Sequence, residues 1–133
     1  MVVADGQGIP LACSTASASP AEVKLVEGVL IQVPRPEDRS IPLIADRAYD
    51  SDPLRERLKQ SKWDLICPHR KSRKRAKTQD GRKLRRYRRR WTIERTIAWP
   101  GNFRRLLVRH EFYVTMYDAF MHLACAMICI RRF

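Results

Sequence analysis

Short blocks of hydrophobic residues alternate with turn-forming residues in the first part of the chain. Residues 2–4 and 9–13 predict two short strands, because the Asp-Gly-Gln-Gly sequence of residues 5–8 is typical of a tight turn. A serine, a proline and a glutamate at residues 19–22 predict the start of a helix. Valines at helical spacing extend this predicted helix to about residue 32.

The middle of the chain predicts strands that alternate with a helix. Residues 42–45 form a continuous apolar run, which is typical of a buried strand. Residues 50–53 open a second helix, whose inward face carries Leu54 and Leu58. Residues 63–67 predict another buried strand. Because strands and helices alternate, we expect an α/β layer fold with the sheet buried between helices.

The last part of the chain predicts a loop and two helices. Residues 69–81 are polar and mostly basic, so we expect a flexible basic loop there. Residues 82–98 return to helical spacing, and a Pro-Gly-Asn sequence at 100–102 ends that helix. Residues 112–132 predict a long helix whose apolar positions face inward. We expect residues 1–133 to form a single domain with a modest core.

The chain is strongly basic, and its charge is unevenly placed. It has 27 Lys and Arg against 14 Asp and Glu, a net charge of +13 and a pI of about 10.4. Residues 70–109 hold 17 of the basic residues and only two acidic ones, Asp80 and Glu94. This balance indicates a polyanionic partner, most simply nucleic acid, although a solvated basic surface is the alternative. The four cysteines have no zinc-site spacing and suit a reducing cytoplasm.

Two carboxylates are candidates for chemistry. Asp46 directly follows the apolar run at 42–45, and functional groups gather beyond the carboxyl ends of strands in open α/β sheets. The alternative is that Asp46 is a turn or cap residue. Glu94 lies in an arginine-rich helix, and Tyr87, Arg90 and Glu94 have the i, i+3, i+7 spacing of one helix face. The alternative for Glu94 is a surface ion pair with Arg90.

Together the two carboxylates predict a divalent-metal site. Hard cations such as Mg²⁺ prefer carboxylate oxygens, and two ions about 3.5–4 Å apart can promote in-line phosphoryl transfer. Asp46 and Glu94, in a basic field that attracts DNA, supply suitable ligands. Tyr87 can stack on a base or bind a phosphate, or it can pack in the core. For Trp91 and Trp99 we favour core packing, and His69 is expected to be an exposed histidine beside the basic loop.

Two segments resemble the DDE transposases of bacterial insertion sequences. Residues 43–52 (Leu-Ile-Ala-Asp-Arg-Ala-Tyr-Asp-Ser-Asp) are similar to the segment around that family's second catalytic aspartate. The spacing Tyr87-x-x-Arg90-x-x-x-Glu94 matches the family's signature, whose glutamate is the third catalytic carboxylate. Residues 5–11 and 102–106 are also similar, so the resemblance covers nearly the whole chain. It implies an RNase H-like fold, a mixed sheet flanked by helices.

The resemblance also implies the roles of individual residues. Asp46 and Glu94 correspond to catalytic, metal-binding carboxylates that act with Mg²⁺ or Mn²⁺. The family's first catalytic aspartate lies upstream of the glycine turn, so we expect a partial domain, incomplete on its N-terminal side and inactive alone. An upstream transposase segment is then an expected partner. Gly101 stands where the signature has a later lysine, which leaves phosphate binding to Arg104 or Arg105.

The predicted function is DNA transposition, with DNA as transposon ends and target. The alternative is a non-catalytic basic DNA-binding remnant or regulator derived from a transposase; an RNA-associated basic protein is a more distant class. A homo-oligomer, no membrane span and a cytoplasmic, nucleoid-associated location are also expected. The residues predicted to contact DNA are Tyr87, Arg90, Lys71, Arg73, Lys74, Arg75, Arg104 and Arg105.

Overall fold

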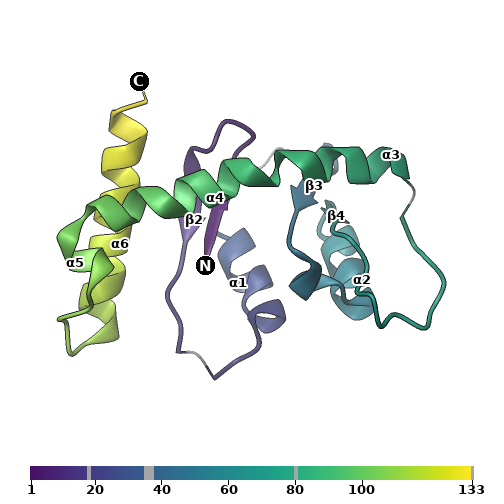
Figure 1. Ribbon diagram of the computed structural model, residues 1–133, viewed down its shortest axis with the longest axis horizontal. Coiled ribbons are helices and arrows are strands. Elements are labelled where there is room, and N and C mark those ends of the chain that lie inside the picture. The colour runs from purple at the N-terminus through teal and green to yellow at the C-terminus, as the bar shows by residue number, and fades with distance from the viewer. Residues whose placement is uncertain (18, 35–37, 80, 133) are drawn as a thin grey trace. The chain divides into compact units, whose positions relative to one another are not determined.

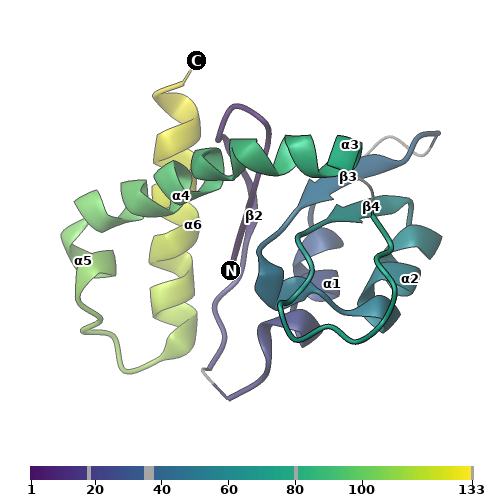
Figure 2. The same cartoon turned by 45° about the vertical axis from the view of Figure 1, so that its right-hand side comes forward.

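Strands and helices both occur in the computed structural model, which describes residues 1–17, 19–34, 38–79 and 81–132 and confirms the α/β class (Figures 1 and 2). The contacts divide the chain into two units. Unit 1 consists of Met1–Ala21, Leu25–Pro34 and Trp91–Phe133, and unit 2 consists of Glu22–Lys24 and Arg35–Arg90. The single domain expected from the sequence stays a prediction.

Unit 1 begins with the hairpin that the sequence predicts. Strands β1 (Val2–Ala4) and β2 (Pro10–Cys13) pair antiparallel. The turn between them is held by the Asp5 carboxylate, which accepts hydrogen bonds from the backbone amides of Gln7 and Ile9, both at 2.9 Å. An aspartate in this position stabilises a turn by replacing backbone acceptors with its own oxygens.

Gly8 brings this turn against a helix of the same unit. Its φ angle is +87°, which only glycine adopts without strain, and its carbonyl accepts a 2.8 Å hydrogen bond from the Thr96 hydroxyl. A Cβ atom added at Gly8 would lie 2.9 Å from the Thr96 hydroxyl oxygen and 3.1 Å from the Thr92 methyl carbon. The absence of a side chain at Gly8 therefore permits the close approach of hairpin and helix.

The other elements of unit 1 are helical. They are α1 (Val26–Leu30), α4 (Trp91–Ala98), the 3₁₀ helix η4 (Trp99–Asn102), α5 (Arg104–Leu107) and α6 (Val114–Ile130). Apolar side chains from β2, α1 and α6 form the core of this unit. The buried residues are Ala12, Cys13, Val26, Val29, Leu30, Val33, Ala124 and Ile128.

Unit 2 contains the strands β3 (Ile41–Ile44) and β4 (Trp63–Ile66), which pair parallel with Ile44 opposite Ile66. Helix α2 (Asp52–Gln60) connects them. The Ser51 hydroxyl caps this helix by accepting from the Leu54 amide, as the sequence signals predict. Leu54 and Leu58 of α2 are buried, as are Trp63, Leu65, Ile66 and Cys67 of the β4 segment.

Three short elements and an arginine-rich stretch complete unit 2. The 3₁₀ helices are η1 (Glu22–Lys24), η2 (Arg47–Tyr49) and η3 (Arg85–Arg90), and helix α3 (Gly81–Leu84) precedes η3. The predicted helix at 82–98 is therefore helical throughout but follows 3₁₀ geometry over six residues. Asp80 lies outside the described residues.

Two sequence expectations need correction. The helix predicted from residue 19 to 32 is broken, with η1 assigned to unit 2 and α1 to unit 1, because its two parts pack against different neighbours. Helix α6 confirms the predicted last helix, but Leu123 on its expected inward face is 56% exposed. The described strands form two separate pairs, so the RNase H-like mixed sheet stays a prediction.

Replacing Gly8 by alanine should lower the free energy of unfolding by roughly 1–3 kcal/mol, the range for a residue held in a sparsely populated backbone conformation. Chemical denaturation measures this loss. Gly6→Ala in the same turn is the matched control, since no atom lies within 4 Å of an added Cβ there. Equal losses of unfolding free energy in the two variants would show that the contact with Thr96 does not restrict the side chain at position 8.

Candidate functional site

Asp46 lies two residues beyond the end of β3, as the sequence predicts. Its carboxylate caps the 3₁₀ helix η2 by accepting a hydrogen bond from the Arg47 amide. The other carboxylate oxygen is 2.9 Å from the Arg90 guanidinium. The Asp46 side chain is 53% exposed, so its oxygens can be reached from solvent. The cap that we considered as an alternative is therefore real, and it fixes the carboxylate at the strand end.

Tyr87 and Arg90 lie together in η3. A 3₁₀ helix has three residues per turn, so side chains three positions apart align along its axis. The Arg90 guanidinium accordingly lies over the Tyr87 ring, 5.6 Å from its centroid. Arg90 therefore contacts two of the side chains that the sequence analysis selected, Tyr87 and Asp46, and all three belong to unit 2.

Glu94 lies in the first turn of α4, in unit 1, and its side chain is exposed. The opposite side of this helix is fixed by the buried residues Thr92 and Thr96. Trp91 is 55% exposed and is covered by the Arg95 guanidinium at 4.9 Å, so the expectation of a core position for Trp91 is wrong. A cation–π contact lets this tryptophan stay at the surface. Asp46 and Glu94 thus lie in different units.

Asp50 is a buried acid that the sequence analysis did not select. Its side chain is 2% exposed and lies 3.1 Å from the Arg55 guanidinium and 2.9 Å from Nδ1 of His69. The backbone amide of Arg70 also donates to it at 2.9 Å. Burial raises the pKa of Asp50, but the hydrogen bonds from the Arg70 amide and from His69, with the charge of Arg73, outweigh burial and hold the pKa below its usual value.

His69 is not the exposed histidine that the sequence suggested, because its side chain is only 10% exposed. Its Nε2 atom accepts a 3.1 Å hydrogen bond from the Thr78 amide, so Nδ1 carries the proton and donates to Asp50. The residues next to His69 in the sequence do not reveal that it is buried, since its partners Asp50 and Thr78 are distant in sequence.

The basic loop, residues 69–79, has no helix or strand, and Gly81 at the end of the predicted loop begins α3. The flexibility expected of this loop stays a prediction. Its cations fall into two groups. Arg73 is 11% exposed and donates to both carboxylate oxygens of Asp52, at 2.9 and 3.1 Å. Lys71 and Lys74 are exposed, and Arg75 is 79% exposed. Arg73 therefore holds the loop, whereas Lys71, Lys74 and Arg75 face solvent.

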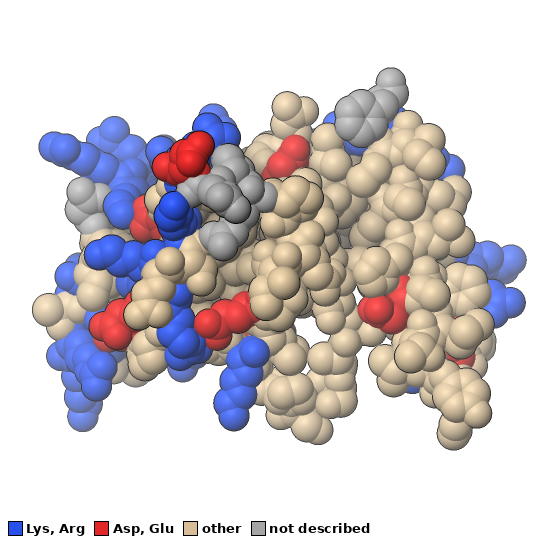
Figure 3. Space-filling view, turned by 180° about the vertical axis from the view of Figure 1, so that it is seen from behind, with Lys and Arg blue, Asp and Glu red and all other residues tan. Residues whose placement is uncertain are grey.

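Lys and Arg side chains also dominate the visible surface of unit 2, interspersed with a few acids (Figure 3). Asp52 is one of these acids, and the hydrogen bond from Arg73 lowers its pKa. Lys83 of α3 contacts Asp64 of β4 at 2.8 Å. This surface is consistent with the polyanionic partner expected from composition.

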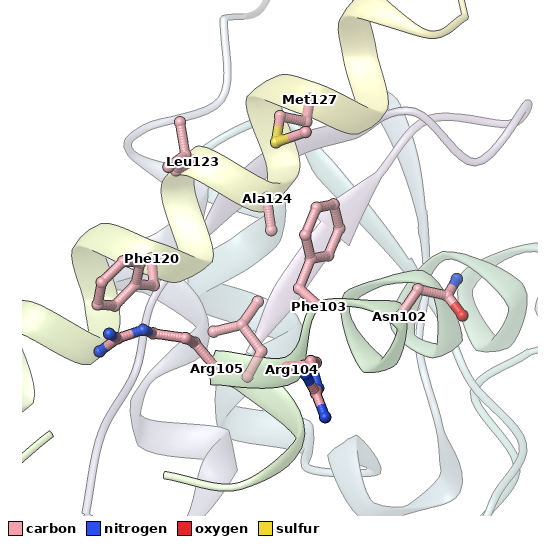
Figure 4. Close-up of a pocket in the computed structure, with 9 residues that line it drawn as sticks. Asn102, Phe103, Arg104, Arg105, Phe120, Leu123, Ala124 and Met127 are labelled. Atoms are coloured by element: carbon pink, nitrogen blue, oxygen red, sulfur yellow. The ribbon is translucent and has the colours of Figure 1, made fainter. Parts of the chain in front are cut away.

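Arg104 and Arg105 lie in α5 of unit 1, beside a hollow of about 360 Å³. Arg105 extends over the Phe120 ring, 5.3 Å from its centroid, and Phe103 points toward Ala124 of α6 (Figure 4). The Arg105 guanidinium also contacts Glu111 at 3.0 Å, and this hydrogen bond lowers the pKa of Glu111. Arg104 also lines the hollow (Figure 4).

No three His, Cys, Asp or Glu side chains gather as a metal cluster within the described ranges. The metal-ligand roles of Asp46 and Glu94 therefore stay predictions. Among the described helices, none combines the length and the apolar character that crossing a lipid bilayer requires.

Stability should fall as the pH is lowered below about 4, the usual pKa range of carboxyl groups. A carboxyl group with a lowered folded-state pKa adds stability above its unfolded pKa, and this stability is lost as the pH falls through the folded pKa. Asp50, Asp52 and Glu111 all have lowered pKa values. Denaturation at a series of pH values measures the effect. Asp50→Asn should show a shallower dependence on pH; an unchanged slope would contradict the role of Asp50.

Comparisons with known proteins agree with the two motifs. The model of the transposase DDE domain family matches residues 1–129. A curated relative is the putative transposase for insertion sequence element IS402 of Burkholderia cepacia, which is 32% identical over 135 residues. The alignment covers 96% of this chain and 60% of the relative, so the chain spans less than two thirds of that protein. No solved structure gives a significant match. From the family match and the motifs together, the chain belongs to the transposase DDE domain family.

Proposed function

We propose that this chain takes part in DNA transposition as a DNA-binding part of a transposase that contributes Asp46 and Glu94 to a divalent-metal site. The observation that carries the proposal is the 2.9 Å ion pair between Asp46 and Arg90. These residues come from two separate motifs, 44 positions apart in the sequence. Their contact in one unit supports a shared site.

The donor chemistry of Asp46 fits a hard cation. Its carboxylate stands at the end of β3, is half-exposed and is oriented by the Arg47 amide. A ligand fixed by a strand and a backbone hydrogen bond needs little reorganisation when a metal binds. Glu94 supplies a second exposed carboxylate on a helix that Thr92 and Thr96 hold in place. Mg²⁺ or Mn²⁺, when bound, would activate a water molecule and stabilise the leaving 3′ oxygen.

Arg90 and Tyr87 are assigned to the DNA strand beside the metal ligands. The Arg90 guanidinium neutralises Asp46 and lies over the Tyr87 ring. A DNA phosphate near Asp46 would offer Arg90 a second anion and offset the repulsion between phosphate and carboxylate. The Tyr87 ring gives this guanidinium a fixed position, which favours one orientation of the bound strand.

The exposed cations of the basic loop supply most of the affinity in this proposal. Lys71, Lys74 and Arg75 face solvent, and contacts to the phosphate backbone need charge but little geometry. Arg104 of α5 is a further candidate for backbone contact, while Arg105 is engaged by Glu111. The proposal includes the RNase H-like arrangement, DNA ends and target as substrates, and a homo-oligomer, all of which the family resemblance implies.

Binding to a random DNA duplex should weaken steeply with salt, with a slope of about −0.9 in log K against log salt for each phosphate contacted. Arg90→Ala should weaken binding more than Lys59→Ala and reduce the slope by about 0.9, because one contact is lost. Lys59 is an exposed cation of α2 and makes a matched control. Arg55 does not, since its guanidinium donates to the Leu65 carbonyl at 2.9 Å. Equal effects of the two substitutions would remove the specific role of Arg90.

Metal binding tests the two carboxylates separately from DNA affinity. Asp46→Asn and Glu94→Gln should each weaken Mn²⁺ binding to the chain, followed by electron paramagnetic resonance, by about tenfold or more. Asp64→Asn removes the same charge from an exposed aspartate that pairs with Lys83, so it should leave Mn²⁺ binding unchanged. Both metal-site variants should still bind DNA. Unchanged Mn²⁺ affinity in both would favour a non-catalytic DNA-binding protein derived from a transposase.

A further inference from the structure

The buried carboxylate of Asp50 attaches the start of the basic loop, residues 69–79, to the rest of unit 2. The two oxygens of Asp50 accept hydrogen bonds from the first residues of the loop, His69 through Nδ1 and Arg70 through its backbone amide, both at 2.9 Å. Arg73 within the loop lies 3.6 Å from the same carboxylate. On the other side, Arg55 of α2 donates to Asp50 at 3.1 Å.

His69 extends this attachment to the far end of the loop. Its Nε2 atom accepts from the Thr78 amide at 3.1 Å while Nδ1 donates to Asp50, so one imidazole links residues nine positions apart. Gln79 completes the closure by donating to the Leu65 carbonyl of β4 at 2.8 Å. The two ends of the loop are therefore fixed to each other and to the strand.

Arg73 organises the interior of the loop in the same manner. Its guanidinium donates to both oxygens of Asp52 and also to the Ala76 carbonyl, at 2.9 Å from Nη2. The chain between Arg73 and Ala76 is thereby folded around a side chain that is itself only 11% exposed. Lys74 and Arg75 lie at the outside of this turn and are exposed.

We infer that Asp50 is a positioning residue for DNA binding, which holds the basic loop so that Lys71, Lys74 and Arg75 face a phosphate backbone together. The inference rests on the proposed function, because it assigns the loop to DNA. A loop that is already ordered loses less conformational entropy on binding.

Replacing Asp50 by asparagine distinguishes two explanations, because one expects stronger DNA binding and the other expects weaker DNA binding. If only net charge mattered, Asp50→Asn would remove a negative charge from a basic protein and strengthen DNA binding. If Asp50 positions the loop, the same substitution weakens binding, because the cations no longer point in one direction. Asp64→Asn is the matched control, since Asp64 pairs with Lys83 of α3, which lies outside the loop.

The experiment uses the full chain and a random DNA duplex at one fixed salt concentration. We expect about tenfold weaker binding for Asp50→Asn, comparable to the cost of ordering one residue, and unchanged or tighter binding for Asp64→Asn. Limited trypsin digestion should cut Asp50→Asn faster after the loop's Lys and Arg residues. Binding by Asp50→Asn as tight as the wild type, with Asp64→Asn behaving alike, would overturn the inference.

His69→Ala covers the case in which Asp50→Asn fails to fold, which circular dichroism reveals. Because Nε2 of His69 accepts from the Thr78 amide, the imidazole is neutral, so this variant keeps the net charge but loses the links to Asp50 and Thr78. Faster loop cleavage with weaker DNA binding supports the inference, and unchanged cleavage or unchanged affinity refutes it. The trypsin result needs no DNA: if the wild type shows no salt-dependent DNA binding, the proposed function fails, and loop cleavage still tests the attachment.

Discussion

Electrostatic compensation within unit 2 is the constraint on which this part of the structure depends. The residues after position 69 are dense in Lys and Arg, and such a segment repels itself unless acids lie near it. The segment from Asp46 to Asp64 supplies them. Its ion pairs with the later cations are Asp46 with Arg90, Asp50 with Arg73, Asp52 with Arg73 and Arg75, and Asp64 with Lys83. The aspartates of the segment from Asp46 to Asp64 thus offset part of the charge of the basic segment.

The ion pairs of unit 2 differ in how firmly they hold the basic residues, and this difference is relevant to DNA binding. Exposed ion pairs such as Asp64 with Lys83 contribute little stability, because water and salt screen them. The Asp50 carboxylate differs, since it is nearly inaccessible and has several donors. Breaking a buried pair leaves an uncompensated charge, which is strongly destabilising. A basic segment can therefore be firmly attached at few points while most of its cations stay available to a polyanion.

The sequence was sufficient to predict those structural features that depend on residues close together in the chain. The glycine turn, the strand before Asp46 and the helix start at residues 50–53 were all predicted, because each depends on neighbouring residues. Asp46 was located at a strand end for the same reason. The contact between Asp46 and Arg90 supports the two motifs, but their spacing alone could not show it.

The features that the sequence analysis missed around Asp50 concern side chains whose partners are far away in the sequence. Arg55 was not selected by the sequence analysis, yet its guanidinium reaches the Leu65 carbonyl and Asp50. His69 was considered exposed, and no pattern around it identifies Asp50 or Thr78 as partners. Amphipathic spacing tells which face of an element is apolar, but not which polar group a buried guanidinium or imidazole will meet. The metal-ligand roles of Asp46 and Glu94 were not tested by the fold.

The contact between Gly8 and Thr96 also limits how the sequence can vary. The Thr96 hydroxyl donates to the Gly8 carbonyl and lies within hydrogen-bonding distance, 3.0 Å, of the Thr92 carbonyl one turn earlier. A valine at position 96 has the same shape but would leave the buried Gly8 carbonyl without this donor. A bulkier side chain at position 96 would meet the turn backbone. Positions 8 and 96 are therefore interdependent across 88 residues: substitutions acceptable at one depend on the other, and serine is the conservative replacement that keeps the hydroxyl.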